Sequence, residues 1–382
     1  MSAWWLVIPV AICVWSAVYQ WLGVWLVARW LREAAGSLAT LPPVTLLRPL
    51  KPGVPDLRGK LETLVRAMRP DDQLVLGAAA GSAELRECAA FQRDFLDREI
   101  VLVSCGEGAA VNPKISKLVQ MEGKCRHERL ILSDSEALID CAWLDAFRTE
   151  WEVHAADAMT TAYRFVRAAT WPARLDAVPT LLSLWPGLAL VRRWGRVDFT
   201  LGACTGLRQS DLAEAGGWKA FGDFLAEDRE LGAALAARGK AIRLASIVTT
   251  LDSDPLTWRD WWRHQRRVAV TYRVGAPAGF AGMLLTHGAT AALVLAVMPL
   301  RPWCVAGAVA LFVIRWLGAR SLARILSFPI PVLPVSMLVA GLTETVVWCL
   351  SWLPGRVWWS GRWWRVTRQG KLVEMSQSAP AS

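Results

Sequence analysis

Long hydrophobic stretches at both ends of the chain constrain its fold most strongly. Trp4 to Ala28 contains no charged residue, and about 20 apolar residues suffice to cross a bilayer as a helix. The stretch is longer than a signal-peptide core and lacks a convincing cleavage site, so we interpret residues 1–30 as a membrane anchor. Arg29 and Arg32 follow it. By the positive-inside rule they predict that the next domain is cytoplasmic and that the protein lies in the cell (inner or plasma) membrane.

The carboxy-terminal region, residues 276–353, predicts two further spans and one irregular segment, which makes the protein multi-pass. Residues 276–300 and 303–317 are the candidate spans. Prolines at 329, 331 and 334 crowd the start of a third apolar stretch that ends at Leu353. Because proline interrupts a helix, we expect that stretch to be interfacial or re-entrant at its start. The tail, residues 354–382, is rich in Arg and Trp and suits a cytoplasmic membrane interface.

Composition limits what the middle of the chain does. The 382 residues leave room for one domain of about 200–250 residues between the membrane segments. The net charge of +10 fits a membrane surface, and no zinc-finger or base-stacking motif supports a nucleic-acid partner. The eight cysteines form no C-x-x-C pair, so we expect free thiols. The 23 tryptophans suit an aromatic belt better than a stacking surface for a sugar acceptor.

Strand and helix patterns alternate within residues 40–270. Short apolar runs that read as strands are separated by stretches with helical spacing, which is typical of βαβ units. The sequence therefore predicts an α/β domain with a mainly parallel sheet. The expected strands are residues 44–49, 73–78, 100–103 and 130–133, and the expected helices are residues 57–69, 83–98 and 112–121.

Acidic residues follow the fourth expected strand, where Asp134-Ser135-Glu136 comes directly after Ser133. In open α/β sheets, ligands bind at the carboxyl ends of the strands. Carboxylates at that edge can share a divalent cation with a diphosphate. The alternative is a turn or a helix cap, since Asp and Ser favour both.

Two later motifs carry further charge. Glu227-Asp228 begins a helical stretch and suits a general base, although acidic residues also favour the first turn of a helix through its dipole. Arg263 and Arg266 suit bidentate contacts to a leaving diphosphate. The alternative for these arginines is an amphipathic interfacial helix that contacts anionic lipid headgroups.

The order of these motifs resembles that of a known family, the ceramide glucosyltransferase and hopanoid-biosynthesis glycosyltransferases. These are membrane-bound, inverting GT-A enzymes akin to glycosyltransferase family 2. The resemblance runs from about residue 40 to residue 290. It rests on Arg48-Pro49-Leu50-Lys51, Asn112-Pro113-Lys114, Asp134-Ser135-Glu136, Tyr163-Arg164, Gly202-Ala203-Cys204, Gly216-Gly217-Trp218, Glu227-Asp228 and Arg263-x-x-Arg266.

The resemblance implies a role for each motif. It places Mg²⁺ or Mn²⁺ on Asp134 and Glu136, makes Asp228 the catalytic base, and puts Arg263 and Arg266 at the leaving diphosphate. The remaining residues divide into a nucleotide-sugar group, Pro49, Glu84, Asn112, Lys114 and Asp134, and an acceptor-side group, Gly202, Cys204 and Glu227.

The sequence departs from the family pattern at three places. Glu136 replaces the usual second Asp of the metal motif, and Arg267 stands where Trp is expected. The family carries an Asp that contacts the uracil ring after the second strand, whereas residues 77–84 contain no Asp and only one acid, Glu84. Either nucleotide recognition is altered, or Glu84 substitutes for the missing residue.

The expected function is transfer of a hexose or N-acetylhexosamine from a UDP-sugar to a lipid hydroxyl, with inversion. A ceramide, a hopanoid and a glycerolipid are all open as acceptors. One alternative is a catalytically degenerate relative that acts as a scaffold or lipid binder. Another is a processive polysaccharide synthase, which would need more spans and an intact Gln-x-x-Arg-Trp motif.

Overall fold

The computed structural model describes residues 4–33, 36–38, 40–252, 256–297, 302–353 and 356–375. The chain divides into two compact units. The sheet unit comprises Trp30–Arg167 and Trp194–Asp254, and the helical unit comprises Met1–Arg29, Ala168–Arg193 and Pro255–Ser382. Residues 168–193 and 255–270 thus group with the apolar helices, although they fall within the expected domain of residues 40–270.

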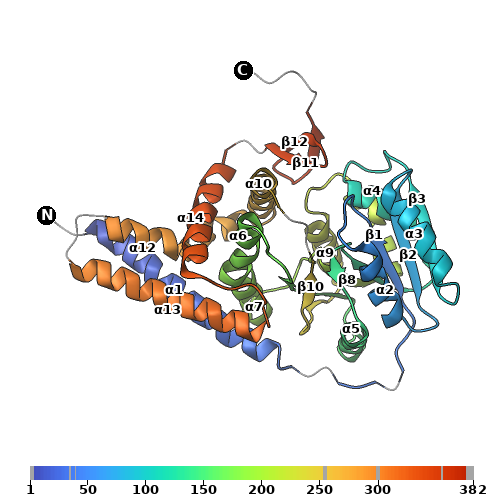
Figure 1. Cartoon of the computed structure of the whole chain (residues 1–382), viewed down its shortest axis with the longest axis horizontal. Coiled ribbons are helices and arrows are strands. Elements are labelled where there is room, and N and C mark those ends of the chain that lie inside the picture. Colours follow the sequence, from blue (N-terminus) through green and yellow to red (C-terminus); the bar gives the residue numbers. More distant parts are fainter. Residues whose placement is uncertain are drawn as a thin grey trace. The chain divides into compact units, whose positions relative to one another are not determined.

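The sheet unit is built on a seven-stranded sheet in the order β3-β2-β1-β4-β8-β6-β9 (Figure 1). Strand β1 pairs in parallel with β2 and β4, β2 with β3, and β6 with β9, whereas β8 is antiparallel to both β4 and β6. The expected α/β class with a mainly parallel sheet is therefore confirmed. The strands are β1 (Thr45–Pro49), β2 (Gln73–Ala79), β3 (Glu99–Cys105), β4 (Arg129–Ser133), β6 (Ala158–Thr160), β8 (Cys204–Arg208) and β9 (Ile242–Leu244).

Helices and short strands connect these elements. The expected helices are present, and side-chain caps fix where each one begins, whereas α2 and α3 end two and four residues earlier than expected. Asp56, Ser82 and Asn112 each accept hydrogen bonds from the first turn of the helix that follows. The elements are α2 (Leu57–Ala67), α3 (Ala83–Asp94), α4 (Pro113–Glu122), α5 (Cys141–Val153), α8 (Gln209–Glu214), the 3₁₀ turn η2 (Trp218–Phe221), α9 (Glu227–Ala237), and the small sheet β5 (Ala137–Leu138), β10 (Thr249–Leu251) and β7 (Tyr163–Phe165).

The strand order reverses at β1. The chain runs from β1 to β2 and β3 on one side, and β4 then pairs on the other side of β1. Such a switch point is where open α/β sheets hold ligands, outside the carboxyl ends of the strands. Pro49 ends β1 at this edge, and Asp134 directly follows Ser133, the last residue of β4.

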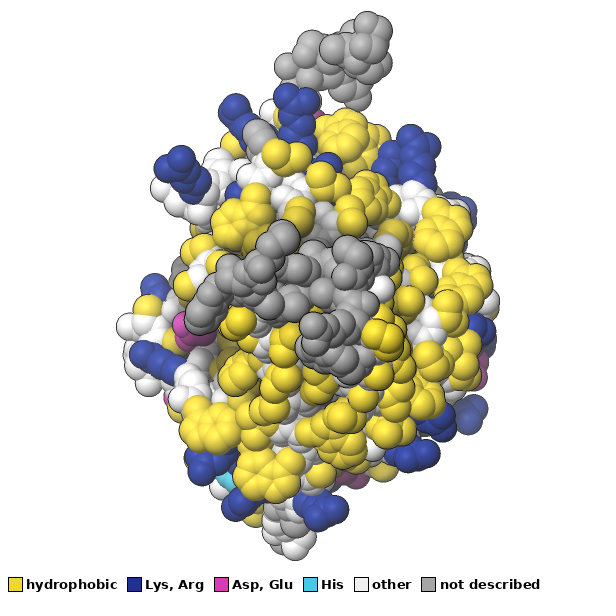
Figure 2. Space-filling view, turned by 90° about the vertical axis from the view of Figure 1, so that its left-hand side faces the viewer, with side chains coloured by type: hydrophobic (Ala, Val, Ile, Leu, Met, Phe, Trp, Pro, Cys, Tyr) yellow, Lys and Arg dark blue, Asp and Glu magenta, His cyan; other side chains and the backbone are white. Residues whose placement is uncertain are grey.

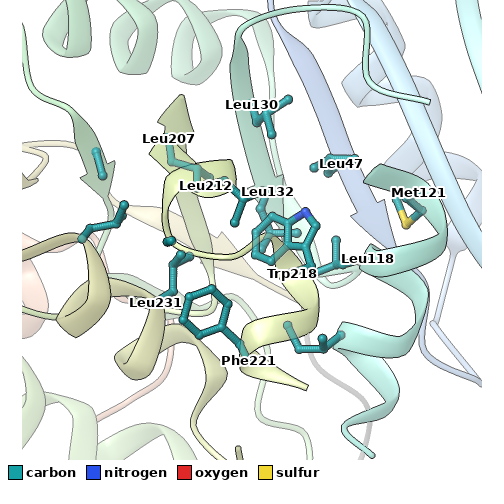
Figure 3. Packing of buried hydrophobic residues seen from close by; sticks show 14 of the residues in the cluster. Leu47, Leu118, Met121, Leu130, Leu132, Leu207, Leu212, Trp218, Phe221 and Leu231 are labelled. Atoms are coloured by element: carbon teal, nitrogen blue, oxygen red, sulfur yellow. The ribbon is translucent and has the colours of Figure 1, made fainter. Parts of the chain in front are cut away.

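A buried hydrophobic core fixes the helices that lead to this edge. Figure 3 shows the indole of Trp218 lying among Leu118, Leu132 and Leu212, which come from three other elements. Trp218 is only 1% exposed. Because fully burying a large apolar side chain contributes about 1.5–3 kcal/mol, this cluster holds α4, η2 and β4 in a fixed arrangement.

The helical unit contains the apolar segments. Three of its helices are long and apolar enough to cross a membrane: Val7–Trp30, Cys304–Ile325 and Pro334–Ser351. Its elements are α1 (Trp4–Trp30), α6 (Trp171–Pro179), the π-helical turn η1 (Thr180–Leu184), α7 (Trp185–Trp194), α10 (Trp258–Gly275), α11 (Pro277–Gly282), the 3₁₀ turn η3 (Met283–Thr286), α12 (Gly288–Val297), α13 (Pro302–Ile325), α14 (Pro334–Ser351), β11 (Arg356–Trp359), β12 (Arg362–Val366) and β13 (Leu372–Glu374).

The interrupted segment is not the one that the prolines indicated. Pro277–Thr286 and Gly288–Ala296 form a pair bent by 42°, so the expected span from 276 is broken at its middle. The third stretch instead holds the continuous helix α14, because Pro334 occupies its first turn, where no backbone N–H is needed. Residues 298–301, at the junction of the two expected spans, lie outside the described residues.

The surface of the membrane-type helices is apolar. Figure 2 shows hydrophobic side chains over most of the visible face, with Lys and Arg side chains around its edges. Ile8, Trp25 and Val309 are each more than half exposed. Apolar area on this scale does not suit water, and together with the helix lengths it fits a lipid environment.

Candidate functional site

Three charged side chains of the sheet unit, Lys114, Asp134 and Asp228, converge on Gly202. Together with Glu227, which pairs with Lys114, we call them the charged cluster. The Lys114 Nζ lies 2.9 Å from Asp134 Oδ1 and 3.3 Å from Glu227 Oε1. A Cβ placed on Gly202 would lie 3.3 Å from Asp228 Oδ2, 3.5 Å from Asp134 Oδ2 and 3.6 Å from Lys114 Nζ. The structure thus brings together residues expected on both the nucleotide and the acceptor side.

Asn112 joins two of the elements that form the charged cluster. Its side-chain oxygen caps α4 by accepting from the backbone N–H groups of Lys114 and Ile115. Its amide nitrogen donates to Glu227 Oε2 at 3.0 Å and to the Phe224 carbonyl at 3.0 Å. The Asn112 side chain is fully buried, so it links the start of α4 to the start of α9 and sets the spacing of Lys114 and Glu227.

Burial and neighbouring charges shift the pKa values of two members of the cluster, Lys114 and Asp228. Burial alone would lower the pKa of Lys114, but the carboxylates of Asp134, Glu227 and Asp228 outweigh it and raise that pKa, so the ammonium stays charged. Burial, and then the charge of Glu227, raise the pKa of Asp228 above its ordinary value, and Lys114 opposes them. Both pKa values are raised, that of Lys114 by its anionic neighbours and that of Asp228 first by burial, and perturbed pKa values of this kind are typical of functional sites.

Asp134 and Glu136, the two expected metal ligands, have different surroundings. Asp134 points to the charged cluster, and the buried Arg48 lies within electrostatic range of it. Glu136 Oε1 instead pairs with Lys51 Nζ at 2.6 Å. Among the residues that the structure describes, no three His, Cys, Asp or Glu side chains are grouped to hold a metal ion. Of the two expected metal ligands, Asp134 lies in the charged cluster and Glu136 pairs with Lys51.

The other expected nucleotide-side and acceptor-side residues lie at the same edge or just below it. Pro49 is buried at the end of β1. Glu84, in the first turn of α3, accepts from the Gly53 backbone N–H at 2.9 Å. Cys204 begins β8 opposite Ser133, fully buried, where burial raises the pKa of its thiol. The cysteine is therefore a packed, protonated neighbour of the site.

Arg263 and Arg266 belong to the helical unit, on α10. The Arg263 guanidinium lies 4.4 Å from the ring centroid of Trp358 on β11, and that of Arg267 lies 5.7 Å from the ring of Trp359. The Nε of Arg266 is buried and has no hydrogen-bond partner among the described residues. Cation–π contacts therefore fix two arginines of α10.

Sequence reasoning missed three contributors to these arrangements. Arg48 is fully buried beneath the edge and donates to Ser133 Oγ and to the Ala137 carbonyl, which supports the turn that holds Asp134. Lys51 neutralises Glu136, and Trp358 packs on Arg263. Arg48 and Lys51 stand within the Arg48-Pro49-Leu50-Lys51 motif, so their motif was the available signal. For Trp358, the signal was its place in the tail of residues 354–382, which is rich in Arg and Trp.

Comparisons with known proteins match the chain to a family of glycosyltransferases. A family described as glycosyl transferase family 21 matches residues 8–372. The probable glycosyltransferase YdaM of Bacillus subtilis (strain 168) is 30% identical over 115 residues, which is 30% of this chain and 27% of that protein. The chain thus matches about a quarter of that relative's length.

One solved structure supports the fold. The mannosyltransferase PcManGT from Pyrobaculum calidifontis, solved in complex with GDP-Man and Mn²⁺, is similar with a TM-score of 0.53. The similarity covers 90% of this chain and 99% of that one at 16% identity. At that identity the likeness concerns the fold, and it agrees with a GT-A-like arrangement.

Proposed function

Because the chain belongs to glycosyl transferase family 21, we propose that it transfers a sugar from a nucleotide-sugar donor to the hydroxyl of a membrane lipid, with inversion. The donor is a UDP-hexose or UDP-N-acetylhexosamine, and the acceptor is a ceramide-, hopanoid- or glycerolipid-like molecule. The observation that carries the proposal is the convergence of Asp134, Lys114 and Asp228 around Gly202 at the switch point of the sheet.

Asp228 is the base in this proposal. Its carboxylate takes the proton of the acceptor hydroxyl while that oxygen bonds to the anomeric carbon and the bond from this carbon to the diphosphate breaks. The diphosphate leaves with the electron pair. A raised pKa makes an aspartate a better proton acceptor near neutral pH, and burial raises that of Asp228. Glu227 holds Lys114 and Asn112 in place beside it.

Lys114 and Asp134 face the diphosphate. Lys114 supplies a compact positive charge to the phosphate oxygens. The hard carboxylate oxygens of Asp134 fit Mg²⁺ or Mn²⁺, which take one or two carboxylates and fill other positions from substrate phosphates and water. A bound divalent cation would add positive charge where the leaving diphosphate becomes more negative. Glu136 contributes less to binding the cation, because Lys51 neutralises its carboxylate.

Calorimetric titration of UDP with and without Mn²⁺ tests the metal assignment. We expect Asp134→Ala to abolish the Mn²⁺-dependent part of UDP binding and Glu136→Ala only to weaken it. Full loss in both variants would make Glu136 a primary ligand, and no loss in either would place the metal elsewhere.

The arginines of α10 complete the proposed chemistry. Arg263 and Arg266 stabilise the departing diphosphate through bidentate contacts. The buried Nε of Arg266, which has no hydrogen-bond partner among the described residues, supports a role in binding an anion.

The proposed topology puts the sheet unit in the cytoplasm, because Arg29 and Arg32 follow the first span. Cys141 is exposed in the sheet unit, whereas Cys88 and Cys105 are buried and would report poorly. A membrane-impermeant maleimide should label Cys141 only after cells are permeabilised, and Cys141→Ser should remove that signal. Labelling of Cys141 in intact cells would reverse the topology.

The transfer itself is tested by mass spectrometry. Purified full-length protein would be incubated with Mn²⁺, a lipid extract and, separately, UDP-glucose, UDP-N-acetylglucosamine and GDP-mannose. We expect one UDP-sugar to add its sugar mass to one lipid class, and the Asp228→Asn protein to add none. Product only with GDP-mannose would overturn the donor assignment. Donor binding without product from any extract would favour the scaffold or lipid-binding alternative.

A further inference from the structure

A largely buried carboxylate on α6, that of Asp176, is contacted by two consecutive side chains of α10. Gln265 Nε2 donates to Asp176 Oδ1 at 2.8 Å, and His264 Nε2 lies 3.4 Å from the same oxygen. Only 12% of the Asp176 side chain is exposed. The transfer chemistry proposed above makes no use of this carboxylate.

Asp176 is also linked to Arg267 through the imidazole of His264. Arg267 Nη2 lies 2.9 Å from His264 Nδ1. Because an arginine nitrogen can only donate, Nδ1 is the acceptor, and we assign the ring hydrogen to Nε2, the atom that faces Asp176. One carboxylate of α6 thus orients two polar side chains of α10 directly and a third through the ring.

Aromatic rings of β11 hold a second face of α10. The Arg263 guanidinium lies 4.4 Å from the ring centroid of Trp358. The Arg267 guanidinium lies 5.7 Å from that of Trp359. Because a helix turns by about 100° per residue, these two arginines share one face of α10, and the two residues that contact Asp176 lie on the face next to it.

Arg266 lies on a third face, so its direction depends on how α10 is rotated about its axis. Its buried Nε has no hydrogen-bond partner among the described residues. Ala269 of α10 also packs with Phe280 and Val347, but apolar contacts have no preferred direction, whereas hydrogen bonds do. The polar contacts to Asp176 are therefore among those that fix the rotation of α10 and, with it, the direction of Arg266.

An acid at position 176 is unfavourable for stability above neutral pH. Burial raises the pKa of Asp176 to about 7, although Arg267 and Gln265 oppose the shift. An asparagine has nearly the same shape and could still accept the hydrogen bond from Gln265 without this cost. A carboxylate that lowers stability where an amide would not is typical of functional positions.

We propose that Asp176 is a positioning residue for the leaving group. By holding α10 through His264 and Gln265, it orients Arg266 toward the departing diphosphate. Asp176 acts through α10 and takes no part in proton transfer. This inference rests on the proposed function, because that function assigns the diphosphate to the arginines of α10.

Calorimetric binding of UDP and UMP to the full-length protein, with Mn²⁺ present, tests the proposal without requiring turnover. Asp176→Asn should weaken UDP binding about three- to tenfold, the range expected for one lost hydrogen bond. UMP binding should stay nearly unchanged, because UMP lacks the second phosphate. Asp176→Leu, which accepts no hydrogen bond, should have at least the same effect on UDP. Asp97→Asn, at an exposed carboxylate, is the control and should bind both nucleotides as wild type does.

A merely structural role for Asp176 would give a different pattern. It would lower the melting temperature and weaken UDP and UMP alike, whereas we expect Asp176→Asn to raise the melting temperature at pH 8 and to lower kcat. In an Arg266→Met background, Asp176→Asn should weaken UDP binding no further, because both changes remove the same contact.

Two results would overturn this inference alone. One is an unchanged ratio of UDP to UMP affinity in both Asp176 variants, and the other is an equal effect of Asp176→Asn with and without Arg266. A wild-type protein that binds no UDP would overturn both this inference and the proposed function.

Discussion

Lys114 forms an ion pair with Asp134 across 2.9 Å, which joins the first turn of α4 to the residue after β4. The same ammonium lies 3.3 Å from Glu227 Oε1. One cation faces three acidic side chains here, counting Asp228. A phosphate that recruits Lys114 therefore needs another positive charge to take its place beside Asp134.

Replacing Lys114 tests this balance of charge. Lys114→Met leaves the carboxylates without their cation, and for a partly exposed pair we expect a loss of about 1–2 kcal/mol in unfolding free energy. Mn²⁺ should then raise the melting temperature more in the variant than in wild type, because it supplies the missing charge. Lys219→Met, at an exposed lysine of η2, is the control. An equal response to Mn²⁺ in both proteins would contradict this account.

Replacing Asp228, the proposed base, should lower turnover without weakening UDP binding. Asp228→Asn keeps the shape of the side chain but cannot take a proton at neutral pH. We expect turnover to fall about 10²–10⁴-fold, with UDP binding by calorimetry nearly unchanged. Asp223→Asn, at an exposed position in the preceding loop, should retain full activity. Near wild-type turnover in the Asp228 variant would remove the assignment.

A methyl group at Gly202 would test whether the charged cluster borders the substrate. Gly202→Ala would put a Cβ 3.3–3.6 Å from Asp228, Asp134 and Lys114 without needing a left-handed backbone. We expect a folded protein whose turnover and donor affinity each fall several-fold, because the Asp228 carboxylate has to shift and a methyl group takes up space between the charged side chains. Gly123→Ala, where a Cβ meets nothing within 4 Å, should behave as wild type. Donor kinetics and melting temperature provide the measurement, and unchanged kinetics would show that the cluster does not border the substrate.

The Trp358–Arg263 contact should matter for catalysis if α10 holds the leaving group. Trp358→Ala removes a cation–π contact worth about 0.5–2 kcal/mol and should lower kcat/KM for the donor by about three- to tenfold. Trp358→Phe keeps a ring under Arg263 and should restore part of the loss. If both variants fall equally, the ring does not position Arg263.

Asp176 on α6 predicts a pH dependence of stability. Burial raises the pKa of Asp176 to about 7, although the nearby Arg267 and a hydrogen bond from Gln265 oppose the shift. His264 Nε2 also lies 3.4 Å from this carboxylate. Asp176 therefore keeps its proton to a higher pH in the folded protein than in the unfolded chain. Its protonated form contributes stability that is fully present below about pH 4 and is lost as the pH rises toward 7.

Asp176→Asn should remove this dependence and raise the melting temperature at pH 8 relative to wild type. The comparison is a series of melting curves from pH 5 to pH 8, with Asp97→Asn, an exposed carboxylate, as the control. A wild-type protein that gains stability relative to Asp176→Asn as pH rises would contradict the sign.

The strands of the sheet unit were predictable where the pattern of apolar residues along a short segment determines its secondary structure. Buried apolar runs predicted β1 to β4, and a strand ending at Ser133 placed Asp134 at the ligand edge. The pairing of Lys51 with Glu136 was not predictable, because 85 positions separate the two residues and no periodicity links them. The position of the broken span was also missed, since proline at the start of α14 is compatible with the helix, while the bend at His287 has no proline at that point.

The division of the chain bears on how the protein is made. It enters the sheet unit near residue 30, returns to the helical unit for residues 168–193, and enters each unit once more before it ends. Neither unit is complete when its first segment leaves the ribosome. Strands β8 and β9 of the sheet unit come after residues 168–193, and α14 and β11–β13 of the helical unit come at the end. Until then, the edge of β4 has no β8 to pair with and remains open to other strands. Synthesis is thus the period in which this open strand edge and the apolar helices are most exposed to wrong pairing and aggregation.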